Sequence, residues 1–227
     1  MLSSQGKAFA DDMSDHLYGP PGRVLQWALM AFFSLGLLTA AQARPLHIVA
    51  FGDSLMAGYL LPEKDSFPAQ LEQKLRAAGY DVRVTNAGVS GDTASDGAER
   101  VDWSVPEDTD LVLLELGAND MLRGLAPDMT RAALAQILAR LQARHIRVML
   151  CGMKAAPNLG ADYAAPFEAI YPDLAQQFQV PLYPFFLEGM ARQPELTLSD
   201  GLHPNAQGVG VIVAHIMPML SPLLHMP

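Results

Sequence analysis

The chain has 227 residues, of which 50% are hydrophobic and 17% are charged. This composition supplies ample apolar material for one sizeable core and excludes an intrinsically disordered protein. The formal net charge of −9 argues against nucleic acid or anionic lipid headgroups as partners, because an acidic surface repels phosphate groups.

The N-terminal segment has the pattern of a secretory signal. Residues 24–43 carry no charge, follow a basic residue and end in the small-residue site AQA, as signal peptides do. We therefore expect residues 1–43 to be an N-terminal extension and signal peptide, cleaved after Ala43, and residues 44–227 to form a single domain. The alternative is an uncleaved membrane anchor, for which this uncharged run is just long enough. Cleavage predicts a periplasmic or secreted protein without stable membrane insertion.

Beyond this segment, short apolar runs alternate with helical patterns. In chain order, the predicted elements are a strand over 46–52, a helix from Pro68 to Gly79, strands over 81–88 and 111–119, a helix over 130–145, a strand over 147–153, a helix over 162–179 broken by prolines, a strand over 180–186 and a helix over 205–224. Uninterrupted apolar strands are typical of a parallel sheet buried on both faces. The order predicts an α/β fold, a three-layer α/β/α sandwich around a five-stranded parallel sheet.

Compact polar stretches follow the predicted strands. They are GDSL at 52–55, NAGVSGDT at 86–93, GAND at 117–120 and SDGLHPN at 199–205. Because the carboxyl ends of parallel strands meet at one edge of the sheet, where ligands bind, we expect these stretches to converge. The fold would thus bring together Ser54, Gly91, Asn119, Asp200 and His203.

The chemistry of these five residues is complementary. Serine is a weak nucleophile that needs an adjacent base, and histidine titrates near neutral pH. Asp200 lies three positions before His203, so one tight turn can place a carboxylate against the imidazole and fix its tautomer. The backbone N–H of Gly91 and the side-chain amide of Asn119 can donate to an oxyanion. The pattern favours acyl transfer at Ser54.

Four ordered blocks resemble one family. FGDSLMAGY, NAGVSGDT, ELGANDMLRG and DGLHPN are similar to the signature blocks of the SGNH hydrolases, also called GDSL esterases. The stretch AIYPDLAQQFQVPLYPFF is similar to the branch that includes periplasmic acyl-CoA thioesterase I, lysophospholipase L1 and arylesterase. The resemblance extends from about Leu46 to Leu220 and implies a flavodoxin-like fold with strand order 2-1-3-4-5.

The resemblance also implies roles for the five residues. Ser54 would be the nucleophile, His203 the general base and then acid, and Asp200 the residue that orients His203. The oxyanion hole would consist of the Ser54 and Gly91 backbone N–H groups and the Asn119 side chain. We expect no cofactor and no metal.

Several residues offer alternatives. Gly88 is a rival to Gly91, although the family alignment favours Gly91. The other serines near the blocks are more typical of caps or turns, and the other histidines of structural positions: Ser90, Ser95, Ser199, His47, His145, His215 and His225. A hard-cation site could be assembled from Asp53, Asp92, Asp120, Asp200 and His203, but two-metal phosphoesterases use more histidines than this chain supplies. Cys151, the single cysteine, lies in an apolar run and is expected to be buried and inert.

The expected protein is a secreted serine esterase or thioesterase. Its substrates would be small acyl esters or lysolipids: lysophospholipids, monoacyl lipids, aryl or alkyl esters and acyl thioesters. Residues 153–163 follow a strand at the active-site edge and are a candidate lid. The alternatives are an O-acetylesterase acting on cell-envelope carbohydrate and, from another class, a noncatalytic envelope-binding module.

Overall fold

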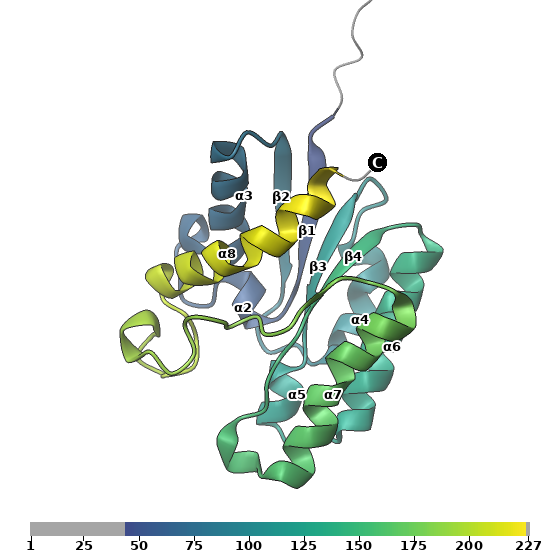
Figure 1. Cartoon of the computed structure of the whole chain (residues 1–227), viewed down its shortest axis with the longest axis vertical. Coiled ribbons are helices and arrows are strands. Elements are labelled where there is room, and N and C mark those ends of the chain that lie inside the picture. The colour runs from purple at the N-terminus through teal and green to yellow at the C-terminus, as the bar shows by residue number, and fades with distance from the viewer. Residues whose placement is uncertain (1–43, 226–227) are drawn as a thin grey trace, which may run out of the picture. The chain divides into compact units, whose positions relative to one another are not determined.

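The computed structural model describes residues 44–225, which form a parallel sheet with helices on both faces (Figure 1). The predicted signal peptide and its cleavage site lie outside these residues. The strand order is β2-β1-β3-β4-β5 and every pairing is parallel, which confirms the predicted sheet. The strands are β1 Leu46–Gly52, β2 Val82–Gly88, β3 Leu111–Glu115, β4 Arg147–Cys151 and β5 Leu182–Tyr183.

The helices form a layer on each side of the sheet. Helices α3 (Phe67–Ala77) and α8 (Ala206–Leu220) lie together on one face, and α4 (Ala94–Ser104), α6 (Pro127–Ala143) and α7 (Ala161–Phe178) lie on the other (Figure 1). The shorter elements are α2 (Ser54–Ala57), α5 (Ala118–Leu122) and the 3₁₀ turns η1 (Glu63–Asp65), η2 (Pro157–Leu159), η3 (Pro194–Leu196) and η4 (Ser221–His225). From β1 the chain passes first to β2 on one side, and it then crosses to β3 on the other side of β1. The direction in which strands are added to the sheet therefore reverses between β1 and β3. Ligand sites of open α/β sheets lie at such a switch point.

Burial explains why the apolar runs become strands. All five residues of β3 are buried, because helices cover both faces of the sheet there. On α6, the predicted apolar stripe of Leu134, Ile137, Leu138 and Leu141 is fully buried. Within residues 44–225, the segment Ala206–His225 is the one helical stretch long and apolar enough to cross a membrane, a test that core helices also pass.

Several elements differ from the sequence-based expectation. The strand expected over 111–119 ends at Glu115, and Asn119 lies in α5 instead. The helix over 162–179 is not broken: α7 runs through Pro166 and Pro172, because a stripe of buried side chains including Phe167 and Ile170 holds both halves on the sheet. The last strand has two residues instead of the seven predicted. Prolines flank it on both sides, and a proline has no N–H to extend the ladder.

Helix α4 is an element that the hydropathy pattern does not predict. Its signal is a capping box in which Thr93 accepts a hydrogen bond from the Asp96 backbone, and the Asp96 side chain accepts one from the Thr93 backbone. Thr93 is also the last residue of the polar block at 86–93, so the same residue ends that block and starts a helix.

Candidate active site

The strand ends bring the predicted residues to one edge of the sheet. Ser54 opens α2 directly after β1, Gly91 lies in the loop after β2, and Asn119 lies in α5 after β3. Asp200 and His203 lie between η3 and α8. Gly52 pairs with both Gly88 and Glu115, so β1, β2 and β3 end at the same level.

Ser54, His203 and Asp200 form a hydrogen-bonded chain. The Ser54 Oγ lies 2.9 Å from His203 Nε2, and His203 Nδ1 lies 2.7 Å from Asp200 Oδ2. A carboxylate only accepts, so Nδ1 carries the proton and Nε2 is left to accept from the Ser54 hydroxyl. The ring of Tyr59 lies against the imidazole at 4.5 Å between centroids. This arrangement can remove a proton from Ser54.

The turn around Asp200 keeps its carboxylate ionised. Oδ1 accepts hydrogen bonds from the Leu202 and His203 backbone N–H groups at 2.9 and 3.0 Å. The Leu202 bond, followed by the His203 contacts, lowers the pKa of Asp200 to about 2. An anion therefore faces the imidazole at neutral pH, which stabilises the imidazolium.

Ser54 is held by a tight strand-to-helix turn. Asp53 caps α2, its Oδ1 accepting from the Leu55 N–H at 3.0 Å, and Gly58 ends the helix in the left-handed conformation. Ser54 itself is 8% exposed. The hydroxyl is thus fixed on a short, rigid segment and faces the cavity described below.

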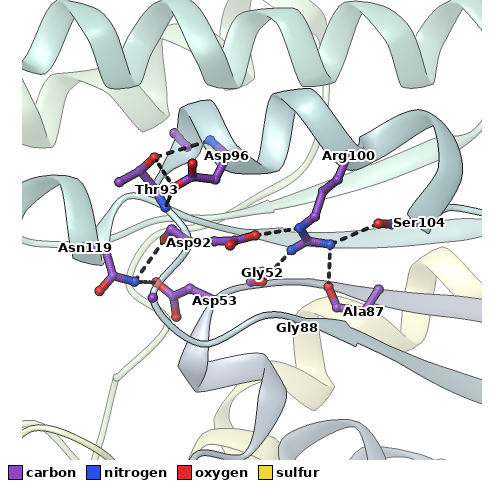
Figure 2. Close-up of polar contacts among 12 residues, drawn as sticks. Gly52, Asp53, Ala87, Gly88, Asp92, Thr93, Asp96, Arg100, Ser104 and Asn119 are labelled. Atoms are coloured by element: carbon purple, nitrogen blue, oxygen red, sulfur yellow. Dashed lines mark hydrogen bonds and ion pairs between the residues drawn. The ribbon is translucent and has the colours of Figure 1, made fainter.

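Asn119 is tied to two of the other blocks. Its Nδ2 donates to Asp53 Oδ2 at 3.0 Å and to the Asp92 carbonyl at 2.9 Å, as Figure 2 shows. Both amide hydrogens are therefore engaged, one with each neighbour. An oxyanion next to Ser54 would have to share one of them.

The two candidate glycines have different surroundings. Gly91 has φ +92°, which favours glycine, and a Cβ there would meet only Arg123 Nη2 at 3.8 Å. A Cβ on Gly88 would lie 2.2 Å from the Ala57 backbone nitrogen. Gly88 thus allows β2 to pack against the nucleophile helix, whereas Gly91 keeps an open backbone position.

A pair of buried carboxyl groups lies beneath Ser54. Asp53 and Glu115 are both 0% exposed, and the Asp53 N–H donates to Glu115 Oε2 at 3.5 Å. Glu115 Oε1 is buried without a hydrogen-bond partner. Burial raises the pKa of Asp53 to about 6, against the lowering effect of the Leu55 N–H, and burial raises the pKa of Glu115 well above its usual value. Burial therefore favours the protonated form of Glu115. Its sequence signal was a carboxylate inside the apolar run LVLLELG.

This pair makes stability depend on pH. A carboxyl group whose folded pKa is raised stabilises the fold below its unfolded pKa, and this contribution is lost as pH rises through the folded value. For Asp53, a rise from 3.8 to about 6 corresponds to a loss of about 3 kcal/mol in unfolding free energy between pH 4 and 7. Glu115→Gln, which keeps a donor beside Asp53 without a titrating charge, is expected to flatten the decline. Urea unfolding at pH 5 and 7.5 measures it.

The exposed substitution Glu107→Gln is the matched control and should keep the wild-type slope. If Glu115→Gln and wild type lost the same stability over this range, Glu115 would not be a source of the decline. The depressed pKa of Asp200 has the opposite sign and acts below pH 4, outside the window measured.

A cavity of about 590 Å³ opens from Ser54. Its polar lining includes Ser54, Asn119 and His203, and its apolar lining includes Leu55, Met121, Leu122, Phe185, Leu187 and Leu202. Residues 153–157 of the predicted lid form one wall, where the Ala156 N–H donates to Met121 Sδ at 3.0 Å. A cavity of this size and polarity suits a small apolar ligand.

The alternative site residues lie elsewhere. Within residues 44–225, Ser54 is the serine whose hydroxyl is bonded to a histidine. His47 is buried and contacts Thr85 and Asp108, and Cys151 is fully buried. In the same part of the chain, no three His, Cys, Asp or Glu side chains are grouped to hold a metal ion.

Comparisons with known proteins agree with this geometry. Residues 50–211 match the GDSL-like lipase/acylhydrolase family. The chain is 39% identical to an arylesterase of Vibrio mimicus (79% of this chain, 89% of the relative). It is 37% identical to thioesterase 1/protease 1/lysophospholipase L1 of Escherichia coli K12 (89% and 96%). Among solved structures, the SGNH-hydrolase family esterase AlinE4 is 44% identical, with a TM-score of 0.68, over 82% of this chain and 100% of that one.

Proposed function

Because this chain belongs to the GDSL-like lipase/acylhydrolase family of SGNH hydrolases and is therefore a carboxylic ester hydrolase, we propose that it works through Ser54, His203 and Asp200 on acyl esters. The observation that carries the proposal is the chain of two hydrogen bonds from Ser54 through His203 to Asp200. Ser54 and His203 line a mainly apolar cavity, as an acyl substrate requires.

The geometry supports a two-step reaction. His203 Nε2 takes the Ser54 proton as Oγ attacks the acyl carbonyl, and the resulting imidazolium is stabilised by Asp200. The imidazolium then protonates the leaving alcohol or thiol, which departs and leaves an acyl group on Ser54. Water, deprotonated by His203, attacks this ester, and the proton returns to Ser54 as the acid is released.

The proposed oxyanion donors are the Ser54 and Gly91 N–H groups and the Asn119 side chain. The open backbone at Gly91 and the contact of Asn119 with the nucleophile turn support this assignment. Since both Asn119 hydrogens already have acceptors, the oxyanion competes with the Asp53 carboxylate or the Asp92 carbonyl for one of them. A donor held in place before the reaction needs little reorganisation.

Within this class, the proposed substrates are lysophospholipids, other monoacyl lipids, aryl or alkyl esters and acyl thioesters. The apolar side chains along the cavity favour an acyl chain over a bare acetyl group. We also propose that the enzyme is exported to the periplasm or beyond, on the signal-like pattern of residues 24–43. Acyl-CoA, a cytosolic compound, would then be a minor substrate.

The test is a series of p-nitrophenyl esters from acetate to palmitate. We expect kcat/KM to peak at medium chain length, because added methylenes bind in the apolar cavity until it is full, each worth about 0.8 kcal/mol. Activity on acetate alone would favour the O-acetylesterase acting on envelope carbohydrate. No turnover of any ester would favour the noncatalytic binding module.

A further inference from the structure

Arg100, in the middle of α4, is a buried cation that the reaction outlined above does not use. It is 6% exposed, and its guanidinium carbon lies 4.1 Å above the ring of Phe51. Its Nε donates to Asp92 Oδ2 at 2.6 Å. Buried ion pairs are poor sources of net stability, so the position of the pair calls for another explanation.

The guanidinium joins the ends of neighbouring strands. Nη2 donates to the Gly52 carbonyl at 2.8 Å, and Nη1 donates to the Ala87 carbonyl at 2.9 Å (Figure 2). Gly52 ends β1 two residues before Ser54, and Ala87 is the penultimate residue of β2. One planar group therefore fixes the spacing between the nucleophile turn and the loop that carries Gly91.

The contact with Asp92 extends this connection to Asn119. Asp92 accepts from Arg100 through its side chain and from Asn119 through its backbone carbonyl (Figure 2). Because Arg100 holds the Asp92 side chain, it also fixes the position of the Asp92 backbone carbonyl. The position of that carbonyl in turn determines where the Asn119 amide is held. The path from guanidinium to amide has two hydrogen bonds and no exposed member.

We propose that Arg100 is a positioning residue that holds the Asn119 amide in place for the oxyanion through Asp92. The inference rests on the proposed ester hydrolysis. A lysine at the same position would keep the charge but not the fork, since an ammonium group cannot reach Asp92, Gly52 and Ala87 in one plane.

The test is a double-mutant cycle on a medium-chain p-nitrophenyl ester. Arg100→Lys is expected to lower kcat by about 10- to 100-fold, because misplacing a catalytic group by about 1 Å costs on that order. KM should change by less than about threefold, since the acyl cavity is untouched. Asn119→Ala alone should lower kcat by about 10²- to 10³-fold, the usual effect of losing one oxyanion donor.

The double variant decides whether Arg100 acts through Asn119. With Asn119 already removed, Arg100→Lys should cost at most about a further threefold. Full multiplication of the two losses would overturn the inference, because it would show that Arg100 acts independently of the amide. A higher KM with an unchanged kcat in Arg100→Lys would overturn the inference as well.

Two further variants guard against a folding defect. Asp92→Asn keeps the carbonyl that holds Asn119 but weakens the ion pair, and the same cycle can be run with it if Arg100→Lys does not fold. Arg140→Met is the matched control: Arg140 also donates to a carbonyl of α4, that of Ala98, but contacts no active-site block, so kcat should be unchanged.

Ser54→Ala on the same ester separates the two proposals. Full activity of Ser54→Ala would refute the proposed mechanism itself. An inactive Ser54→Ala together with an additive cycle would refute only the role of Arg100.

Discussion

Ser54→Ala is expected to lower kcat by about 10⁴- to 10⁶-fold, the largest effect of any single substitution considered for this chain. The reason is that Oγ is the atom that forms the covalent intermediate, and its removal leaves His203 with no hydroxyl to deprotonate. Activity above the uncatalysed rate would come from the oxyanion donors and from binding alone. Steady-state kinetics on the medium-chain ester, with a burst assay for the acyl-enzyme, measures the loss.

His203→Ala should show nearly the same loss, and the double variant Ser54→Ala/His203→Ala should lose little more than either, because the two side chains act as a unit. Thermal melting provides the folding control, since removing one hydroxyl leaves the core of the sheet intact. Ser54→Ala protein that melts normally and keeps a tenth of wild-type activity would refute the assignment of the nucleophile.

Asp200→Asn is expected to lower kcat by about 10³- to 10⁴-fold while the turn around it stays folded. The amide oxygen can still accept from the Leu202 and His203 N–H groups. Its NH₂, however, would face His203 Nδ1 and force the ring proton onto Nε2, which then cannot accept from Ser54. The effect is therefore on kcat and not on stability.

Asp173→Asn, which removes a carboxylate from an exposed ion pair with Arg131, is the matched control and should be fully active. The kinetics of both variants, with a melting curve for each, provide the comparison. Asp200→Asn with more than a tenth of wild-type kcat would mean that solvent near this half-exposed turn can replace the carboxylate.

The strands and the positions of Ser54, Asp200 and His203 could be predicted from the sequence because their signals are local. A buried parallel strand is an apolar run, and Ser54, Asp200 and His203 lie in short blocks at predictable strand ends. The rule that the carboxyl ends of parallel strands share one edge predicts that these blocks lie together. The hydrogen bonds from Ser54 through His203 to Asp200 have the expected partners.

The support beneath the triad could not be predicted, because its contacts join distant parts of the chain. Arg100 lies in a helix that the hydropathy pattern does not predict, and nothing near it in the sequence indicates that its partners are the carbonyls of Gly52 and Ala87. Glu115 stands out in the sequence as a charge in an apolar strand, but its raised pKa follows from complete burial and then from Asp53, which lies 62 positions away. The continuous α7 likewise depends on tertiary packing that outweighs two prolines.

The two margins of the sheet bear on how copies of this enzyme behave together in concentrated solution. A sheet margin exposes unpaired N–H and C=O groups that can recruit a strand from another molecule and start aggregation. At β5 this template is only two residues long and is closed by Pro181 and Pro184. At β2 it carries the charged, exposed Arg83. Both margins thus disfavour intermolecular strand pairing.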